Sequence, residues 1–226
     1  MKKHIPAPDT LPLLSLYMEK YGALAPDPLC PEIRVWNTFD LTGLWQIAYN
    51  RDRNAPVPFW AIIWPGGRAL ARYILDNRKL FSGKRVLDVG TGSGITAVAA
   101  AKAGAKVTGM DIDAAAVALA EMTAEENKVK CKIVVQDPFV MTPEEMKEYD
   151  VILAGDLFYS ESLAASSISF FRSAADAGVE NYVSDGGRTF RPTKGFCILQ
   201  GMRVPVFREI EGVSERDVKI MSIEVV

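Results

Sequence analysis

The sequence contains one histidine, three cysteines and no long apolar run. The histidine, His4, stands almost at the first residue, where chains are usually frayed, so imidazole-based metal catalysis and Ser–His chemistry are disfavoured. The cysteines are widely spaced and form no C-x-x-C pair, which fits neither a disulfide framework nor a zinc site. No segment approaches the roughly 18 apolar residues of a membrane span. We therefore expect a soluble, cytoplasmic protein that binds no metal.

The sequence also lacks an excess of either charge. Its 26 basic and 28 acidic residues give a net charge of −2, so there is no bulk attraction to nucleic acid or to an anionic membrane. With 226 residues, 49% of them hydrophobic, the chain is long enough for one sizeable core. Any partner must therefore be recognised by a local site.

Residues 1–57 differ from the rest because prolines interrupt them repeatedly. The pattern predicts a short helix over 11–21 and one or two strands within "IRVWNTFDLTGLWQIAY", residues 33–49. This segment is too short to be an independent domain. We interpret 1–57 as an N-terminal extension that packs on the main domain, 58–226, where it could form a lid or a substrate-docking surface.

From residue 58 onward, strand patterns alternate with helix patterns. The strand runs are "RVLDVG", "AKVTGMD", "CKIVVQD", "YDVILAGD" and "NYVSD", and the chain closes with a strand pair after Arg203. Such alternation predicts an α/β fold with a doubly wound, mostly parallel sheet covered on both faces. The closing pair would place one antiparallel strand in that sheet.

The first of these strands ends in a glycine-rich turn that contains Asp88, Gly90, Gly92 and Gly94. Ligands of such sheets bind at the carboxyl ends of the strands. The spacing is G-x-G-x-G, with Ile95 where a dinucleotide fingerprint needs its last glycine, and no Walker loop occurs. A carboxylate before the glycines would repel a pyrophosphate but would attract a cationic amino group. The turn therefore favours S-adenosylmethionine.

Acids also end the next two strands. Asp111 lies about twenty residues after the first glycine, where a carboxylate can accept both ribose hydroxyls, and Ile112 follows it. We predict that Asp137 meets the adenine amino group, with Pro138 and Phe139 beside the ring. The alternative for each acid is a helix cap or a solvated loop.

Five motifs resemble those of seven-stranded, Rossmann-like methyltransferases: "PFWAIIWPGG", "VLDVGTGSG", "MDID", "GDLFY" and "SDGGR". The first and fourth narrow the resemblance to the protein-lysine methyltransferases, including those that modify the electron-transfer flavoprotein β-subunit. The resemblance implies the strand order 3-2-1-4-5-7-6 and transfer of a methyl group to a protein lysine. The sequence departs from the family at residues 1–57 and at "DGGR", where the relatives have Asp-Pro-Gly-Arg.

The resemblance also implies roles for individual residues. Asp156 would orient the incoming nitrogen, and Tyr159 would line its channel. The other predicted contacts are Trp64, Gly66 and Gly155 to the cofactor, and Trp60, Phe158 and Arg188 to the substrate. Core packing, a helix N-terminal turn and a solvated loop are the alternatives for the aromatics, Gly66 and Arg188 respectively.

Three other functions remain open at this point. A methyltransferase for a small metabolite would use residues 1–57 as the lid of an enclosed site. A nucleic-acid methyltransferase is disfavoured by the acidic pI and by "DLFY" in place of Asn/Asp-Pro-Pro-Tyr/Phe. An NAD-binding oxidoreductase or a non-catalytic nucleotide-binding module is disfavoured by the glycine spacing.

Overall fold

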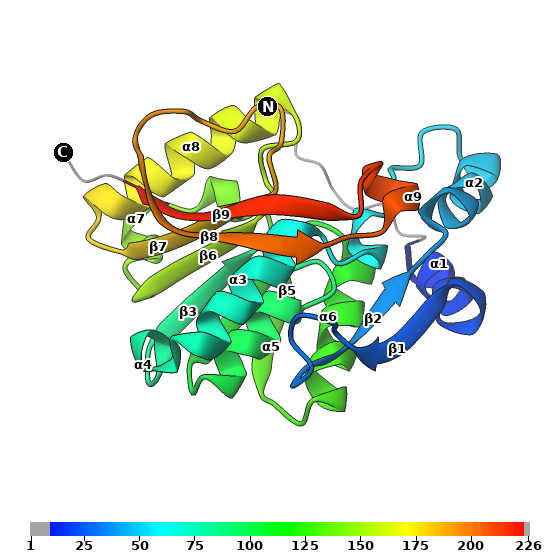
Figure 1. Ribbon diagram of the computed structural model, residues 1–226, viewed down its shortest axis with the longest axis horizontal. Helices are drawn as coiled ribbons and strands as arrows, with labels where there is room; N and C mark the ends of the chain where they lie inside the picture. Colours follow the sequence, from blue (N-terminus) through cyan, green and yellow to red (C-terminus); the bar gives the residue numbers. More distant parts are fainter. Residues whose placement is uncertain (1–9, 224–226) are drawn as a thin grey trace.

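The computed structural model describes residues 10–223, within which seven strands form one central sheet (Figure 1). Its order is β5-β4-β3-β6-β7-β9-β8, which is 3-2-1-4-5-7-6 when these strands are counted along the chain. β9 runs antiparallel to both of its neighbours, and the other pairs are parallel. The predicted fold class and strand order are therefore confirmed. The strands are β3 Arg85–Val89, β4 Lys106–Asp111, β5 Cys131–Val135, β6 Val151–Gly155, β7 Glu180–Asp185, β8 Phe196–Pro205 and β9 Glu215–Ile223.

Helices cover both faces of this sheet (Figure 1). Because successive strand residues point to opposite faces, Val86 and Leu153 pack with α3, α5 and α6, whereas Leu87 and Ile152 pack with α8. Both sets of strand residues are almost completely buried, as expected for strands of a doubly wound sheet. The helices are α3 Pro65–Asp76, α4 Arg78–Phe81, α5 Ile95–Lys102, α6 Ala114–Glu126, α7 Pro143–Met146, α8 Glu161–Asp176 and α9 Arg208–Glu211.

The N-terminal segment packs beside α6, at one end of the sheet (Figure 1). Its helix α1, a following π-helical turn and η2 contribute to a cluster in which Tyr17 and Trp60 meet Leu119 of α6. A separate antiparallel pair, β1 and β2, lies next to this cluster. The elements are α1 Thr10–Leu16, the π-helical turn Tyr17–Tyr21, β1 Gly22–Pro26, β2 Arg34–Thr38, α2 Leu41–Arg51 and the 3-10 turn η2 Phe59–Ala61.

The sequence predicts one or two strands within residues 33–49. The structure has one, β2, and residues 41–49 belong to helix α2 instead. The Asp40 side chain caps this helix by accepting a hydrogen bond from the Gly43 amide at 2.8 Å, and Leu44 is completely buried. The cap and this burial outweigh the strand preference of the aromatic residues, because strand preference depends strongly on context.

A buried ion pair ties the N-terminal segment to the main sheet. Arg68 of α3 donates from Nε to Asp27 Oδ2 at 2.7 Å and from Nη1 to the Pro205 carbonyl at 2.7 Å. Both side chains of the pair are at most 3% exposed. Removing one member of such a pair leaves an uncompensated buried charge and costs about 3–5 kcal/mol. The segment therefore packs against residues of the main sheet and of α3.

Among residues 10–223 no helix is long and apolar enough to cross a membrane. The same part of the chain contains no group of three or more acidic, cysteine or histidine side chains placed to hold a metal ion. His4 lies outside the described residues.

Candidate active site

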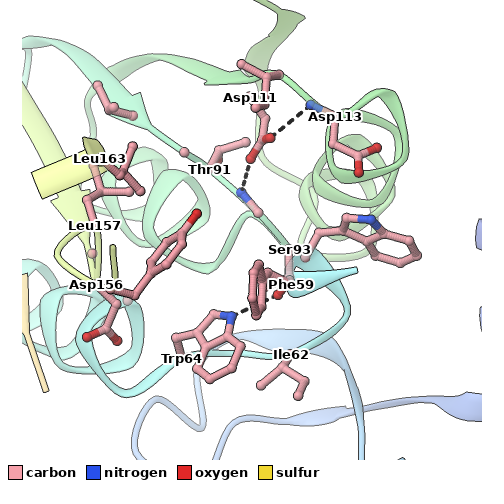
Figure 2. Close-up of a pocket in the computed structure, with 18 of the residues that line it drawn as sticks. Phe59, Ile62, Trp64, Thr91, Ser93, Asp111, Asp113, Asp156, Leu157 and Leu163 are labelled. Atoms are coloured by element: carbon pink, nitrogen blue, oxygen red, sulfur yellow. Dashed lines mark hydrogen bonds between the residues drawn. The ribbon is translucent and has the colours of Figure 1, made fainter. Parts of the chain in front are cut away.

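A cavity of about 850 Å³ opens at the carboxyl ends of β3, β4 and β6 (Figure 2). This is the edge of a doubly wound sheet at which ligands bind. Residues 52–57, the connecting segment after α2, are called the strap. The strap also contributes to the cavity wall, through Asp52, Asn54, Pro56 and Val57. The cavity thus has a floor made by the sheet and a wall made by the N-terminal segment.

The glycine-rich turn forms part of the floor. Gly90, Gly92 and Gly94 all have positive φ angles, of 65°, 52° and 84°, which side chains rarely adopt. Gly90 and Gly92 line the cavity, together with Thr91 and Ser93 between and after them. Because these glycines have no side chain, the backbone of the turn can contact a ligand directly.

Gly94 is a correction to the predicted cofactor contacts because it does not line the cavity. A Cβ atom there would lie 3.0 Å from Ala120 of α6. This glycine therefore serves the close packing of α5 against α6, and its effect on a ligand is indirect.

Asp88 is a buried acid without a counter-charge. It is 2% exposed, it lines the cavity, and it accepts a hydrogen bond from the Thr91 hydroxyl at 2.7 Å. No lysine or arginine in the described part of the chain forms an ion pair with it. Burial raises the pKa of Asp88 to about 7. A cationic ligand group would supply the missing charge.

Asp111 faces the same part of the cavity (Figure 2). Its Oδ2 accepts from the Gly92 amide and its Oδ1 from the Asp113 amide, each at 3.0 Å. Burial raises the pKa of Asp111 to about 6. Because a carboxylate offers about four lone-pair sites, two remain for a diol such as that of a ribose. Ile112, 39% exposed, lies beside it in the cavity wall.

Asp137, Pro138 and Phe139 also line the cavity. Asp137 Oδ1 accepts from the Phe139 amide at 2.9 Å, so this acid also caps the short 3-10 turn that begins at Pro138. The Phe139 ring packs edge-on against Phe170 of α8, with 5.5 Å between the ring centroids. These contacts fix an apolar wall beside the acid, at the place predicted for the adenine.

Asp156 stands at the opposite end of the cavity, directly after β6. It is one of two non-glycine residues in the described chain with positive φ, here 54°, and it is only 5% exposed. A left-handed conformation at such a residue costs on the order of 1–3 kcal/mol and is found mainly at functional sites. The strained turn directs the carboxylate towards the N-terminus of α3.

Both oxygens of Asp156 have protein donors. Oδ2 accepts from the Gly66 amide at 2.5 Å, and Oδ1 accepts from the Gly186 amide at 2.9 Å and from Arg188 Nε at 3.2 Å. A Cβ atom on Gly66 would lie 2.8 Å from the Asp156 Cγ, so only glycine permits this approach. Gly66 itself does not line the cavity, which corrects its predicted role as a cofactor contact.

Three aromatic side chains line the cavity together with this acid. Phe59 packs against Trp64 and Tyr159, with centroid distances of 5.6 and 5.4 Å, and Trp64 Nε1 donates to the Phe59 carbonyl at 2.8 Å (Figure 2). The Arg188 guanidinium lies over the Trp64 ring, 5.1 Å from its centroid. Burial, together with the charge of Asp111, raises the pKa of the Tyr159 phenol above its usual range. Tyr159 is therefore a protonated side chain at neutral pH.

The structure brings most of the predicted residues into one cavity but excludes Phe158. Phe158 is completely buried in the core beneath β6, where it packs against Phe196 at 6.1 Å. The turn at Asp156 directs Leu157 into the cavity and leaves Phe158 behind it, so the predicted substrate contact is wrong. The predicted residues that line the cavity are Trp60, Trp64, Asp88, Gly90, Gly92, Asp111, Ile112, Asp137, Pro138, Phe139, Gly155, Asp156, Tyr159 and Arg188.

Sequence reasoning missed several lining residues. Thr91 and Ser93 could have been found because they alternate with the glycines of the turn. Leu157 follows the predicted Asp156 directly, and Leu163 lies in the first turn of α8. The strap at 52–57 carries no recognisable motif, and only its path past the sheet brings it to the cavity.

Comparison with known proteins agrees with this geometry. The family model described as Ribosomal protein L11 methyltransferase (PrmA) matches residues 69–158. A solved structure of magnesium protoporphyrin IX methyltransferase from Synechocystis PCC 6803, with bound S-adenosylmethionine, superposes with a TM-score of 0.51. The match has 19% sequence identity and covers 82% of this chain and 93% of that one. The chain has the class I methyltransferase fold.

Among proteins with this methyltransferase fold, the chain is similar in sequence to electron transfer flavoprotein beta subunit lysine methyltransferases. Identity to the human protein is 42% over 151 residues, covering 64% of this chain and 53% of the relative. Identity to the Rattus norvegicus protein is 35% over 178 residues, covering 74% and 63%. The chain thus spans between half and two thirds of the length of these relatives.

Proposed function

We propose that this protein is an S-adenosylmethionine-dependent methyltransferase that methylates the side-chain nitrogen of a lysine in a protein substrate. One observation carries the proposal: a single cavity is lined by the buried Asp88 and the half-buried Asp111, neither of which forms an ion pair among the described residues, and also by a third acid, Asp156, and by aromatic side chains. The similarity to the lysine methyltransferases supports the substrate class. The electron transfer flavoprotein β subunit is the first acceptor to test.

The residues at one end of the cavity fit S-adenosylmethionine. Asp88 would receive the amino group, because it is a buried carboxylate without an ion-pair partner among the described residues. Asp111 would accept the ribose hydroxyls, and Ile112 and Phe139 would provide apolar contact to the adenine. When bound, the cofactor supplies a methyl group on a positively charged sulfur, which a neutral amine can attack in line.

The residues at the other end would prepare the amine. Loss of a proton from a lysine with a pKa near 10.4 costs roughly 4–5 kcal/mol at pH 7. Asp156 can accept a hydrogen bond from the nitrogen and favour the positive charge that forms on it as the new bond is made. The rings of Phe59, Trp64 and Tyr159 can hold the aliphatic stem of the lysine by apolar and cation–π contact. Positioning of this kind supplies much of the acceleration in a transfer that needs little acid–base chemistry.

One observation favours a small-molecule acceptor instead. The strap at Asp52–Val57 forms part of the cavity wall, so the N-terminal segment closes one side of the site as well as packing beside it. An enclosed site suits a metabolite better than a loop or helix of a folded protein. The experiment below separates the two classes of acceptor.

The test uses S-adenosylmethionine with a labelled methyl group, the purified protein and two acceptor sources. These are a purified electron transfer flavoprotein β subunit and an extract of the source cells. The site variant is Asp156→Ala. The matched control is Asp217→Ala, which removes a carboxylate that is 85% exposed on β9. Binding of S-adenosylhomocysteine is measured for each variant by calorimetry.

We expect label in protein, resistant to nuclease and sensitive to protease, with the wild-type and Asp217→Ala proteins. Asp156→Ala should lower the transfer rate by at least about 100-fold, the size of effect that loss of one transition-state contact produces. Its affinity for S-adenosylhomocysteine should stay within threefold of wild type. Label confined to the small-molecule fraction would favour the metabolite alternative. Full activity of Asp156→Ala would contradict the role of this acid.

A further inference from the structure

The acceptor end of the cavity is the end that contains Asp156. The carboxylate of Glu211 lies behind this end and does not line the cavity. It belongs to α9, the short helix in the connection between β8 and β9, which lies beside the N-terminal elements in Figure 1. Its side chain is only 5% exposed. The Phe207 ring, at the start of α9, packs edge-on against Phe39 with a centroid distance of 4.7 Å, so α9 begins in contact with the N-terminal segment.

Two guanidinium groups converge on Glu211. Arg188 donates from Nη2 to Oε1 at 2.9 Å and from Nη1 to Oε2 at 3.3 Å. Arg216 of β9 donates from Nε to Oε2 at 2.9 Å and from Nη2 to the Glu211 carbonyl at 3.0 Å. The Glu211 carboxylate therefore accepts hydrogen bonds from both terminal nitrogens of Arg188, here called its terminal fork. Arg216 holds Glu211 in place.

This arrangement limits what Arg188 offers to Asp156. A guanidinium pairs most strongly with a carboxylate through two parallel N–H bonds. With Glu211 in its terminal fork, Arg188 gives Asp156 a single bond from Nε, and that bond is long at 3.2 Å. Without Glu211 the fork would be free to turn towards Asp156 and neutralise it in bidentate geometry. A neutralised Asp156 would attract an incoming amine less strongly.

The Arg188 backbone does not provide the same restraint. Asp185 Oδ1 accepts from the amides of Gly187 and Arg188, which fixes the "DGGR" turn, but these bonds leave the side chain free to rotate. Stacking on Trp64 restrains the plane of the guanidinium, and Glu211 restrains the direction of its fork.

We propose that Glu211 is a positioning residue of the methyl-transfer site, which keeps Arg188 from neutralising Asp156. The inference rests on the proposed function. Its chemistry is a chain of alternating charges, Asp156–Arg188–Glu211–Arg216, in which only the first two members line the cavity. The effect on cofactor binding should be small, because Asp88 and Asp111 belong to other strands.

The test compares Glu211→Gln with Glu209→Gln, an exposed glutamate on the same short helix. For Glu211→Gln we expect kcat/KM for the protein acceptor to fall about tenfold, the effect of losing 1.4 kcal/mol of transition-state stabilisation. The affinity for S-adenosylhomocysteine should stay within twofold. Glu209→Gln should match the wild type in both measurements.

A double-mutant cycle separates positioning from a general structural role. In an Arg188→Met background there is no guanidinium left to restrain, so adding Glu211→Gln should change kcat/KM by less than about twofold. A tenfold loss that persists in this background would overturn the proposal. An equal loss of S-adenosylhomocysteine affinity or an unchanged kcat/KM in Glu211→Gln would also overturn it.

A spectroscopic measurement needs no acceptor, so it separates failure of this inference from failure of the proposed function. The Arg188 Nε–Hε resonance is identified in nitrogen–proton correlation spectra as the signal lost in Arg188→Met. We expect it to shift in Glu211→Gln and to stay in place in Glu209→Gln. An unmoved resonance in Glu211→Gln would overturn the restraint itself, whether or not any acceptor is methylated.

Discussion

The acids at the two ends of the cavity have different electrostatic surroundings. At the end built by β3 and β4, Asp88 and Asp111 are held by a hydroxyl and by backbone amides, and their pKa values are raised to about 7 and 6. At the end built by β6 and β7, Asp156 has an arginine at 3.2 Å and two amides. The first pair of acids lacks a cation, and the third acid has one.

This difference indicates which end of the site is complete before a ligand arrives. A buried carboxylate without a counter-charge destabilises its ionised form, so the first end gains most from a cationic ligand. The carboxylate at the second end already has protein hydrogen-bond donors and is restrained by them, so it is suited to orienting a group during a reaction. Ligand affinity should therefore depend on the first end and transfer rate on the second. The following predictions test that separation.

The largest effect on ligand affinity is expected for Asp88→Asn. Removal of one partner of a buried charge pair costs about 2–5 kcal/mol, so S-adenosylhomocysteine should bind roughly 100-fold more weakly, as measured by calorimetry. Asp217→Asn is the control. An unchanged affinity would show that Asp88 does not receive the ligand's amino group.

The same variant should stabilise the unliganded protein at alkaline pH. The pKa of Asp88 in the folded state, about 7, lies above its unfolded value, so its contribution to stability is complete at low pH and is lost as the pH rises through 7. Asparagine carries no such penalty. The melting temperature of Asp88→Asn minus that of wild type should therefore increase between pH 5 and pH 8.

Gly66→Ala should affect the opposite end of the cavity. Its new methyl group would lie 2.8 Å from the Asp156 Cγ and would displace that side chain. We expect the transfer rate to fall about 10- to 100-fold, because misplacement of a positioning group by about 1 Å has effects of this size. S-adenosylhomocysteine affinity should stay within threefold. Gly201→Ala, where the added Cβ atom meets nothing within 4 Å, is the control.

The pH dependence of ligand affinity should reflect ionisation of the acids at the first end of the cavity and not of Asp156. A bound cation favours ionised Asp88, so binding releases a proton, and affinity should fall by up to about tenfold per pH unit below the free pKa of about 7. Calorimetry at pH 6.5 in two buffers of different ionisation enthalpy measures this release. The dependence should weaken clearly in Asp88→Asn, where Asp111, with a pKa of about 6, is the remaining acid at this end. A flat affinity between pH 6 and 8 in wild type would contradict the assignment.

The smallest effect is expected for Tyr159→Phe. Phenylalanine retains the ring that packs 5.4 Å from Phe59, and only a hydroxyl is lost. The transfer rate should change by less than about threefold, which corresponds to under 1 kcal/mol. A loss of 100-fold or more in steady-state kinetics would instead assign the hydroxyl a direct part in the chemistry.

Most of the residues at the cofactor end could be predicted because their signals are local, although Gly94 does not line the cavity. Asp88 lies near the end of β3, just before the glycine turn, Asp111 is the last residue of β4, and Asp137 lies two residues after β5. Parallel strands place such positions at one edge of the sheet, so the order of the chain is enough to bring them together. Phe158 was assigned incorrectly for the same reason. Its motif is local, but the direction of its side chain depends on the positive φ of Asp156.

By itself, the sequence determined the doubly wound α/β sheet and pointed to the acids and glycines at the carboxyl ends of its strands, because periodicity and turn chemistry act over a few residues. The strand order came from the resemblance to known methyltransferases, since periodicity does not specify which strands are neighbours. Only the tertiary structure decided the acceptor end. Gly66 meets Asp156 across 90 positions, Asp156 meets Arg188 across 32, and Arg188 meets Glu211 across 23. The strap at 52–57 likewise reaches the cavity through the packing of the N-terminal segment. No local pattern specifies such partners, because they are selected by which buried charges and donors the folded chain brings within hydrogen-bond distance.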